Sequence, residues 1–216
     1  MSTLSLRHAS RVALITVPAV LFATCAAILP PSAPPQGPLS SAEFAELQRS
    51  AMFGDEDVRY LRMSRAVLEP QIDEILDLWY GFVGSQPHLL ASFANPDGEP
   101  IPDYLAAVRQ RFGRWILTTA DAQFDDDWLA AQHEIGLRHH RAKKNRTDGV
   151  DAAPHIRLRH VVALTYPITH TLRPFLAAGD HSHTAEAIDK MHQAWTKAVL
   201  LQVTLWSKPY VKPGDF

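Results

Sequence analysis

The sequence of 216 residues has a single cysteine, Cys25, and almost no excess of charge of either sign. One cysteine excludes an intramolecular disulfide and any zinc or iron–sulfur site built on several cysteines. With 21 Lys and Arg residues against 23 Asp and Glu residues, the net charge of -2 gives no basic field that would hold nucleic acid. Metal chemistry must therefore use other ligands, and nucleic acid is not an expected partner.

Several other signals of function are also missing. The sequence contains no glycine-rich phosphate loop, no Gly-x-Ser-x-Gly elbow and no internal repeat. A content of 46% hydrophobic and 20% charged residues is typical of globular proteins, which excludes a disordered or multi-spanning chain. The length fits one large domain or one domain with an appendage.

The first 38 residues differ from the rest of the chain. Residues 12–29 are uncharged, Arg7 and Arg11 precede them, and five prolines follow between 30 and 38. A basic flank, an apolar run and a proline-rich spacer are typical of a targeting or anchoring segment. We expect residues 1–38 to be an uncleaved anchor, a cleaved export signal or a misassigned start, and residues 39–216 to form the folded domain, which is membrane-anchored, exported or cytoplasmic accordingly.

The folded part is predicted to be all-α, with about seven or eight helices, because apolar residues recur at intervals of three and four and no segment alternates as a strand would. Ser40 with Glu43 forms a capping box, so the first helix begins near Ser41. Gly84 is expected to end the third helix, and Pro167 to bend the penultimate one. The further expected elements are a short helix from 55, helices at about 72–83, 104–116, 125–143, 155–177 and 184–207, a turn at 95–98 and a polar loop at 145–154.

Histidine is the remaining candidate for metal ligation, since nine of the 11 histidines lie at or after His133. His139 is the most informative of them. At about 100° per residue, His139 and Ile135 both point within about 20° of Trp128, so His139 lies on the buried stripe of its helix. Such a histidine is either a hydrogen-bonded core residue or, in an all-α chain of this size, the proximal ligand of a haem iron.

A gas-binding haem pocket needs an opposite wall of large apolar side chains with few hydrogen-bond donors. Trp79, Tyr80 and Phe112 suit that wall, although they are also compatible with an ordinary aromatic core. The hydroxyl of Tyr80 has the chemistry to donate a hydrogen bond to a bound diatomic gas.

Competing metal motifs are weaker. His133-Glu134 begins like a zinc-protease motif, but Leu137 stands where the second histidine is required. His181 and His183 belong to a polar connection that is typical of a solvated loop. A basic cluster, residues 138–146, is explained by a helix C-terminus, and it also suits haem propionates or an acidic partner.

Long stretches of the chain, covering about residues 40 to 216, resemble the protoglobins, single-domain relatives of the globin domains of globin-coupled sensors. The resemblance is carried by Asp77-Leu-Trp-Tyr-Gly-Phe-Val-Gly-Ser85, Tyr104-Leu-Ala-Ala-Val-Arg109, Arg111-Phe-Gly-Arg-Trp-Ile-Leu117, Glu134-Ile-Gly-Leu-Arg-His-His-Arg141, Leu201-Gln-Val-Thr-Leu-Trp206 and Tyr210-Val-Lys-Pro-Gly-Asp-Phe216.

This resemblance implies a globin-like fold with an extra N-terminal helix, a haem b cofactor and a homodimer built through the last two helices. It implies that His139 is the proximal ligand of the iron, and that O2, CO and NO bind reversibly for sensing, transport or detoxification. The cofactor-binding positions that it implies are Trp79, Tyr80, Val108, Phe112, Leu164 and Ile168.

Two departures from the family pattern stand out. Leu164 occupies a position where a bulkier phenylalanine is familiar, so the pocket or its access tunnel is expected to be more open. The apolar segment at residues 12–29 has no counterpart in the familiar cytosolic members.

Other functions stay open at this point. The chain is alternatively a haem enzyme with peroxidase-like or nitrite- or NO-converting activity, a sensor that signals through a separate partner, or a helical interaction module in which His139 is a core residue. The expected distal wall offers only Tyr80 and Trp79 as acid or base groups, which favours gas binding over turnover.

Overall fold

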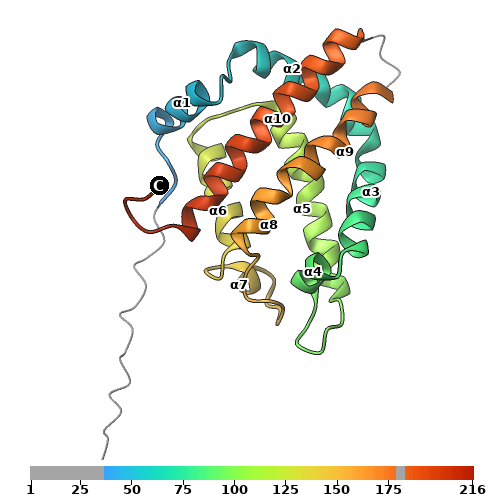
Figure 1. Cartoon of the computed structure of the whole chain (residues 1–216), viewed down its shortest axis with the longest axis vertical. Helices are drawn as coiled ribbons and strands as arrows, with labels where there is room; N and C mark the ends of the chain where they lie inside the picture. The colour runs from blue at the N-terminus through green and yellow to red at the C-terminus, as the bar shows by residue number, and fades with distance from the viewer. Residues whose placement is uncertain (1–36, 179–182) are drawn as a thin grey trace, which may run out of the picture. The chain divides into compact units, whose positions relative to one another are not determined.

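A computed structural model describes residues 37–178 and 183–216, which belong to one compact unit (Figure 1). Within these residues the secondary structure is helical apart from one isolated bridge between Ala94 and Pro100, which confirms the all-α prediction. The α-helices are α1 (Ser41–Ser50), α2 (Asp55–Leu68), α3 (Ile72–Ser85), α4 (Pro87–Leu90), α5 (Pro102–Asp121), α6 (Asp126–His139), α7 (Lys144–Asp148), α8 (Leu158–Ala163), α9 (Thr165–Ala178) and α10 (Ala185–Ser207). Three short 3-10 turns are η1 (Glu69–Gln71), η2 (Ala91–Phe93) and η3 (Lys208–Tyr210).

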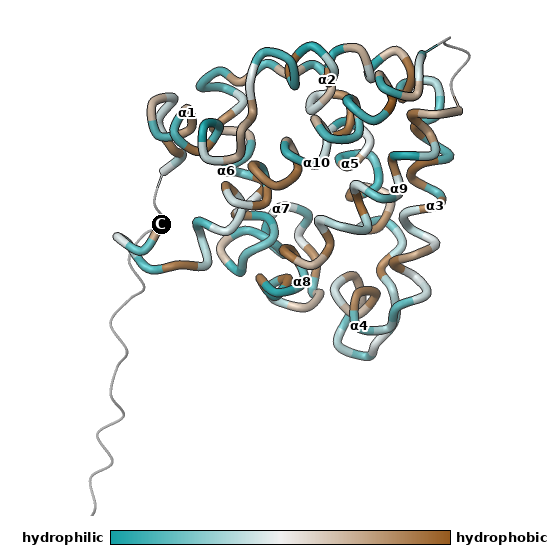
Figure 2. The backbone as a smooth tube through the Cα atoms, turned by 45° about the horizontal axis from the view of Figure 1, so that its top comes forward, coloured by the Kyte–Doolittle hydropathy of each residue, from teal (hydrophilic) through white to brown (hydrophobic). Residues whose placement is uncertain are grey.

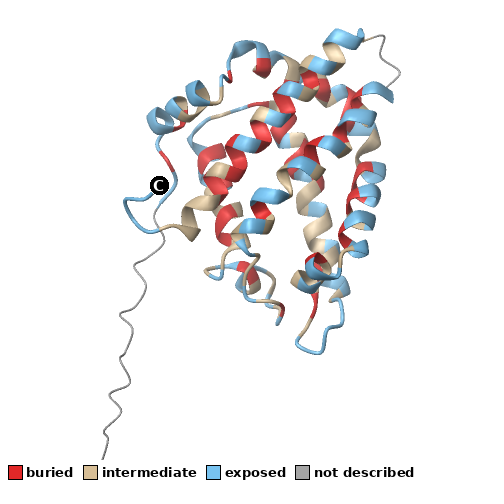
Figure 3. Cartoon of the chain, in the orientation of Figure 1, coloured by how far each residue is buried: buried red, intermediate tan, exposed pale blue. Residues whose placement is uncertain are grey.

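Helix α10 is the central element of the core. It packs against α2, α6 and α9, and Figure 1 shows it running between α6 and α9. Its buried side chains continue along most of its length, whereas the outer side of α3 is exposed (Figure 3). Apolar and hydrophilic residues are interleaved along the helices (Figure 2), as expected when each helix buries one side.

The predicted start of the first helix is confirmed in atomic detail. The Glu43 amide donates to the Ser40 hydroxyl at 3.3 Å, and the Ser40 amide donates to the Glu43 carboxylate at 2.8 Å. These two bonds satisfy backbone donors that the first helical turn leaves free. The hydrogen bonds from Ser40 lower the pKa of Glu43 because they stabilise its ionised form.

The penultimate helix predicted at 155–177 is two helices. Helix α8 ends at Ala163, and α9 begins at Thr165, with Leu164 between them. Pro167 explains this division, because it lacks the amide proton that would bond to the carbonyl of Ala163 four residues earlier. Leu164 is thereby placed at the bend and packs against the core.

Three boundary predictions are wrong. Helix α3 continues through Gly84 to Ser85, because the following Pro87 ends it instead. Helix α6 ends at His139 rather than near 143, and the expected loop at 145–154 opens with the short helix α7, which Gly149 terminates at a φ of 63°. The turn at 95–98 is confirmed, with Gly98 at a φ of 86°.

The apolar segment at residues 12–29 lies outside the described residues, and the domain boundary at 38/39 stays a prediction. Among the helices that the structure describes, none has the length and apolar character needed to cross a bilayer.

Candidate functional site

A cavity of about 200 Å³ lies among the described helices, with walls from η2 and from all the α-helices between α3 and α10. Its surface is mostly apolar and aromatic, with a small number of polar groups, as in sites for small molecules and cofactors. All of the site residues singled out from the sequence line this one cavity: Trp79, Tyr80, Val108, Phe112, His139, Leu164 and Ile168.

His139 is the last residue of α6, and its side chain is fixed by the turn before it. Nδ1 of His139 lies 2.8 Å from the carbonyl oxygen of Ile135. Because a carbonyl only accepts, Nδ1 carries the proton, and Nε2 keeps the lone pair that a metal ion requires. Burial is the main cause that lowers the pKa of His139, with a smaller contribution from the charge of Lys144. The imidazole is therefore held neutral.

Trp206, near the end of α10, forms the wall beside His139. The two rings are nearly parallel, with centroids 5.4 Å apart and an interplanar angle of 11°. The indole N–H of Trp206 donates to Oε1 of buried Gln132 at 2.9 Å. Gly136 permits this packing, since a Cβ there would lie 3.0 Å from Cα of Trp206.

The opposite wall is aromatic and comes from α3 and α5. Trp79 contacts Phe112 with ring centroids 5.5 Å apart, and Tyr80 meets the same ring edge-on at 6.5 Å. The Tyr80 hydroxyl forms no hydrogen bond with any of the described residues. Burial raises the pKa of Tyr80 well above its ordinary value, so the hydroxyl keeps its proton and stays a donor.

An unbroken series of ring contacts joins the two walls. Phe112 stacks on Trp115 with centroids 5.2 Å apart, and Trp115 contacts Trp206 at 5.8 Å. The indole N–H of Trp115 is satisfied by Oε1 of buried Gln202 at 2.5 Å. We call the set Trp79, Phe112, Trp115, Trp206 and His139 the aromatic series.

The polar part of the cavity lies on α5 and α7, and the sequence did not reveal it as a site. Arg111 forms two hydrogen bonds with the Asp148 carboxylate, at 2.9 and 2.8 Å. Lys144 also lines the cavity, and its ammonium donates to the carbonyl oxygen of Ser92 at 2.8 Å. The only sequence signal was the basic cluster at 138–146, which did not distinguish a buried lysine from its exposed neighbours.

Elsewhere in the described parts of the chain, no three His, Cys, Asp or Glu side chains converge as a site for a metal ion would require. His181 lies outside the described residues. His133 lies on α6 away from the cavity wall, and burial is the main cause that lowers its pKa.

Comparison with known proteins gives a consistent result. The family model described as Protoglobin matches residues 40–215. Among solved structures, the globin domain of the Geobacter sulfurreducens globin-coupled sensor is similar to this chain, with a TM-score of 0.57, 14% identity, and coverage of 78% of this chain and 97% of that domain. At this identity the likeness establishes a globin-like fold. None of the curated proteins matches the chain.

Proposed function

We propose, from the premise that this chain belongs to the protoglobin family, that it is a haem protein in which His139 is the proximal ligand and O2, CO and NO are bound reversibly. Family membership supports the general class, a globin-type haem protein that binds gas. The hydrogen bond between Nδ1 of His139 and the carbonyl oxygen of Ile135 carries the assignment of the ligand. It leaves Nε2 as the ring nitrogen for a metal, the arrangement typical of metal-bound histidines.

The residues of the cavity fit haem b. Its walls are aromatic and aliphatic on both sides, which suits the porphyrin, and cationic groups on α5, α6 and α7 suit its propionates. When bound, haem supplies an iron with one position open to a diatomic gas. Trp79 and Phe112 keep water from that space, and the Tyr80 hydroxyl offers a gas molecule one hydrogen bond.

The proposed ligand is tested by adding hemin to the purified protein and to His139→Gly. The wild type should acquire a Soret band, whereas His139→Gly should lose the histidine-ligated spectrum and regain a similar one when free imidazole is added. His140→Ala is the matched control, because His140 is the next residue and does not line the cavity. A colourless wild type after hemin addition would overturn the proposed function, and an unaltered spectrum of His139→Gly would overturn the ligand.

The smaller side chain of Leu164, in place of the familiar phenylalanine, is proposed to leave a more open route to the cavity. It lies at the bend between α8 and α9 and contributes to the cavity wall. Leu164→Phe should slow CO rebinding after photolysis by several-fold, since the larger ring fills space beside the pocket. Equal rebinding rates in the variant and the wild type would remove the idea.

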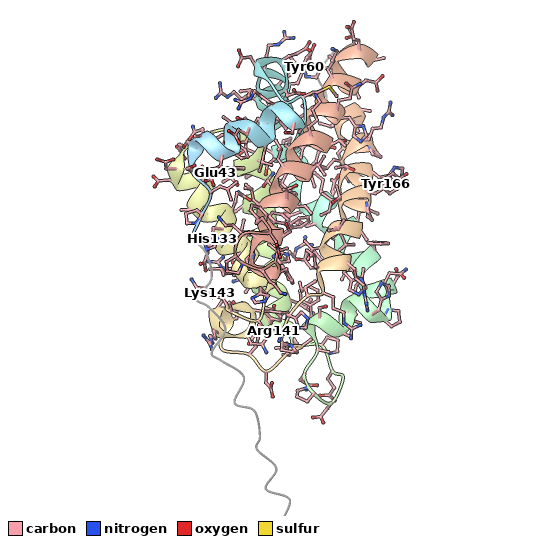
Figure 4. All side chains as sticks on the ribbon, turned by 60° about the vertical axis from the view of Figure 1, so that its left-hand side comes forward. Glu43, Tyr60, His133, Arg141, Lys143 and Tyr166 are labelled. Carbon is pink, nitrogen blue, oxygen red and sulfur yellow. The ribbon has the colours of Figure 1, made fainter. Side chains whose placement is uncertain are left out.

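The dimer through the last two helices is part of the same proposal. Tyr166 on α9 is 70% exposed and Leu200 on α10 is 50% exposed, and Tyr166 points outward in Figure 4. A contiguous apolar patch marks an interface, and the proposal requires that these two side chains, on helices that pack against each other, belong to one such patch. Sedimentation analysis should give a dimer for the wild type and a monomer for Leu200→Glu. A monomeric wild type would contradict this part.

A further inference from the structure

Lys144 is the most unusual charged residue of the structure. It is the first residue of α7, and only 1% of its surface is exposed. Its ammonium lies 5.2 Å from the centroid of the Tyr104 ring and donates to the carbonyl oxygen of Ser92. These neighbours are neutral. Burying an ammonium is costly unless an opposite charge compensates it.

No carboxylate among the described residues forms a salt bridge with Lys144. The negative charge of Asp148 acts on Lys144, but this carboxylate is already bound through both oxygens by Arg111. Lys144, Arg111 and Asp148 together carry two positive charges and one negative charge, so this group of three has one positive charge in excess. Burial lowers the pKa of Lys144 to about 8, which leaves most of the side chain protonated near neutral pH.

The neighbouring lysine shows how different this environment is. Lys143 is exposed, is labelled in Figure 4, and pairs with the Glu134 carboxylate at 2.5 Å. Arg138 shares that same carboxylate at 3.1 Å. Two adjacent lysines therefore differ in their charge pairing: among the described residues Lys143 has a carboxylate partner, and Lys144 has none.

We propose that Lys144 is the binding partner of a carboxylate on the molecule that occupies the cavity. The occupant would combine a large apolar body, matched by the aromatic walls, with an anionic group that compensates the excess positive charge. This inference rests on the proposed function, under which the carboxylate is a haem propionate. The side of the cavity formed by α7 and η2 would then orient the cofactor, and His139 would ligate it.

The test compares Lys144→Met with the matched control Lys143→Met, each loaded with hemin or with hemin dimethyl ester, whose carboxylates are masked. The measurement is the rate at which each protein loses its haem to an excess of apomyoglobin. A charge-assisted hydrogen bond corresponds to a change on the order of 10- to 100-fold in binding. Lys144→Met should therefore lose hemin faster by that factor and lose the dimethyl ester at the wild-type rate. Lys143→Met should match the wild type with both.

The other outcomes are decisive as well. If Lys144→Met loses hemin and the dimethyl ester equally faster than the wild type, Lys144 acts only through the fold. If it loses neither faster, Lys144 does not contact the propionate. Both results overturn the inference while the proposed function stands. If Lys144→Met does not fold, Lys144→Gln completes the same comparison. A wild type that never takes up hemin overturns the proposed function, and the inference with it.

Discussion

The imidazole of His139 and the indole of Trp206 lie face to face, with centroids 5.4 Å apart and planes 11° apart. His139 is thus restrained twice, by its hydrogen bond to Ile135 and by this stacked ring. The hydrogen bond decides which ring nitrogen keeps its lone pair. The indole limits rotation of the imidazole ring about the bond that links it to Cβ. The orientation of the proposed ligand therefore depends on a residue 67 positions further along the chain.

Replacing Trp206 should disturb the proposed ligand as well as the core. Trp206→Leu removes the stacked ring and leaves the side chain of Gln132 without its donor, so we expect a loss of about 2–4 kcal/mol in unfolding free energy. In the haem-loaded protein the Fe–His stretching band in the resonance Raman spectrum should broaden or shift. Trp206→Phe keeps an aromatic face and should keep the band. An identical band in Trp206→Leu would show that the indole does not orient His139.

Gly136 sets the distance between α6 and α10. A methyl group there would lie 3.0 Å from Cα and 3.2 Å from the carbonyl oxygen of Trp206, and backbone atoms cannot move aside cheaply. Gly136→Ala should lower the unfolding free energy by about 1–3 kcal/mol. The control is Gly84→Ala in α3, which meets no atom within 4 Å and should raise stability by up to about 1 kcal/mol. Urea denaturation of both variants checks this difference, and changes of the same sign would contradict it.

The Tyr80 hydroxyl should matter for gas binding and little for folding. It has no hydrogen-bond partner among the described residues to lose, so Tyr80→Phe should change the unfolding free energy by less than about 0.5 kcal/mol. The rate of O2 dissociation should rise by on the order of tenfold, because one hydrogen bond to the gas is lost.

Tyr210→Phe is expected to show the reverse pattern. The Tyr210 hydroxyl donates to the carbonyl oxygen of Ile156 at 2.7 Å and does not line the cavity. Its loss should cost about 1 kcal/mol of stability with little effect on the O2 dissociation rate. Indistinguishable O2 dissociation rates for Tyr80→Phe and the wild type would refute the proposed role of Tyr80.

The buried ammonium of Lys144 should make the stability of the haem-free protein depend on pH. Burial lowers its pKa to about 8, whereas in an unfolded chain lysine titrates near ~10.4. Between these values the unfolded chain binds more protons, so the folded state loses stability as pH falls through this window. Raising the pH from about 7 to about 9.5 should therefore stabilise the wild type more than Lys144→Met. Chemical denaturation at both pH values measures the difference, and equal gains would argue against it.

The features predicted correctly from the sequence depend on neighbours in the chain. The capping box needs only Ser40 and Glu43, and the position of His139 on the side of α6 that faces the cavity follows from its spacing from Trp128 and Ile135. The helical phase also explains why most of the site residues converge, since those on helices lie on the sides that the helices bury together, whereas Leu164 is placed by the bend between α8 and α9.

The features that sequence reasoning missed depend on contacts between distant residues. Lys144 follows Lys143 in a basic cluster, and only the positions of Ser92 and Tyr104 show that it is buried. Gly84 looked like a helix terminus, but the end of α3 is set by Pro87. The pairing of Arg111 with Asp148 joins α5 to α7 through two residues 37 positions apart along the chain, and no local pattern encodes it.

The aromatic series has a consequence for how substitutions in the cavity combine. Trp115 touches Phe112 on one wall and Trp206 on the other, so the two walls share a rigid intermediary in a densely packed interior. The energetic effects of changing Trp79 and His139 should then not add, although these residues lie on opposite walls. The evolution of this protein would be constrained accordingly, because an amino-acid substitution on one wall changes which substitutions the other wall tolerates.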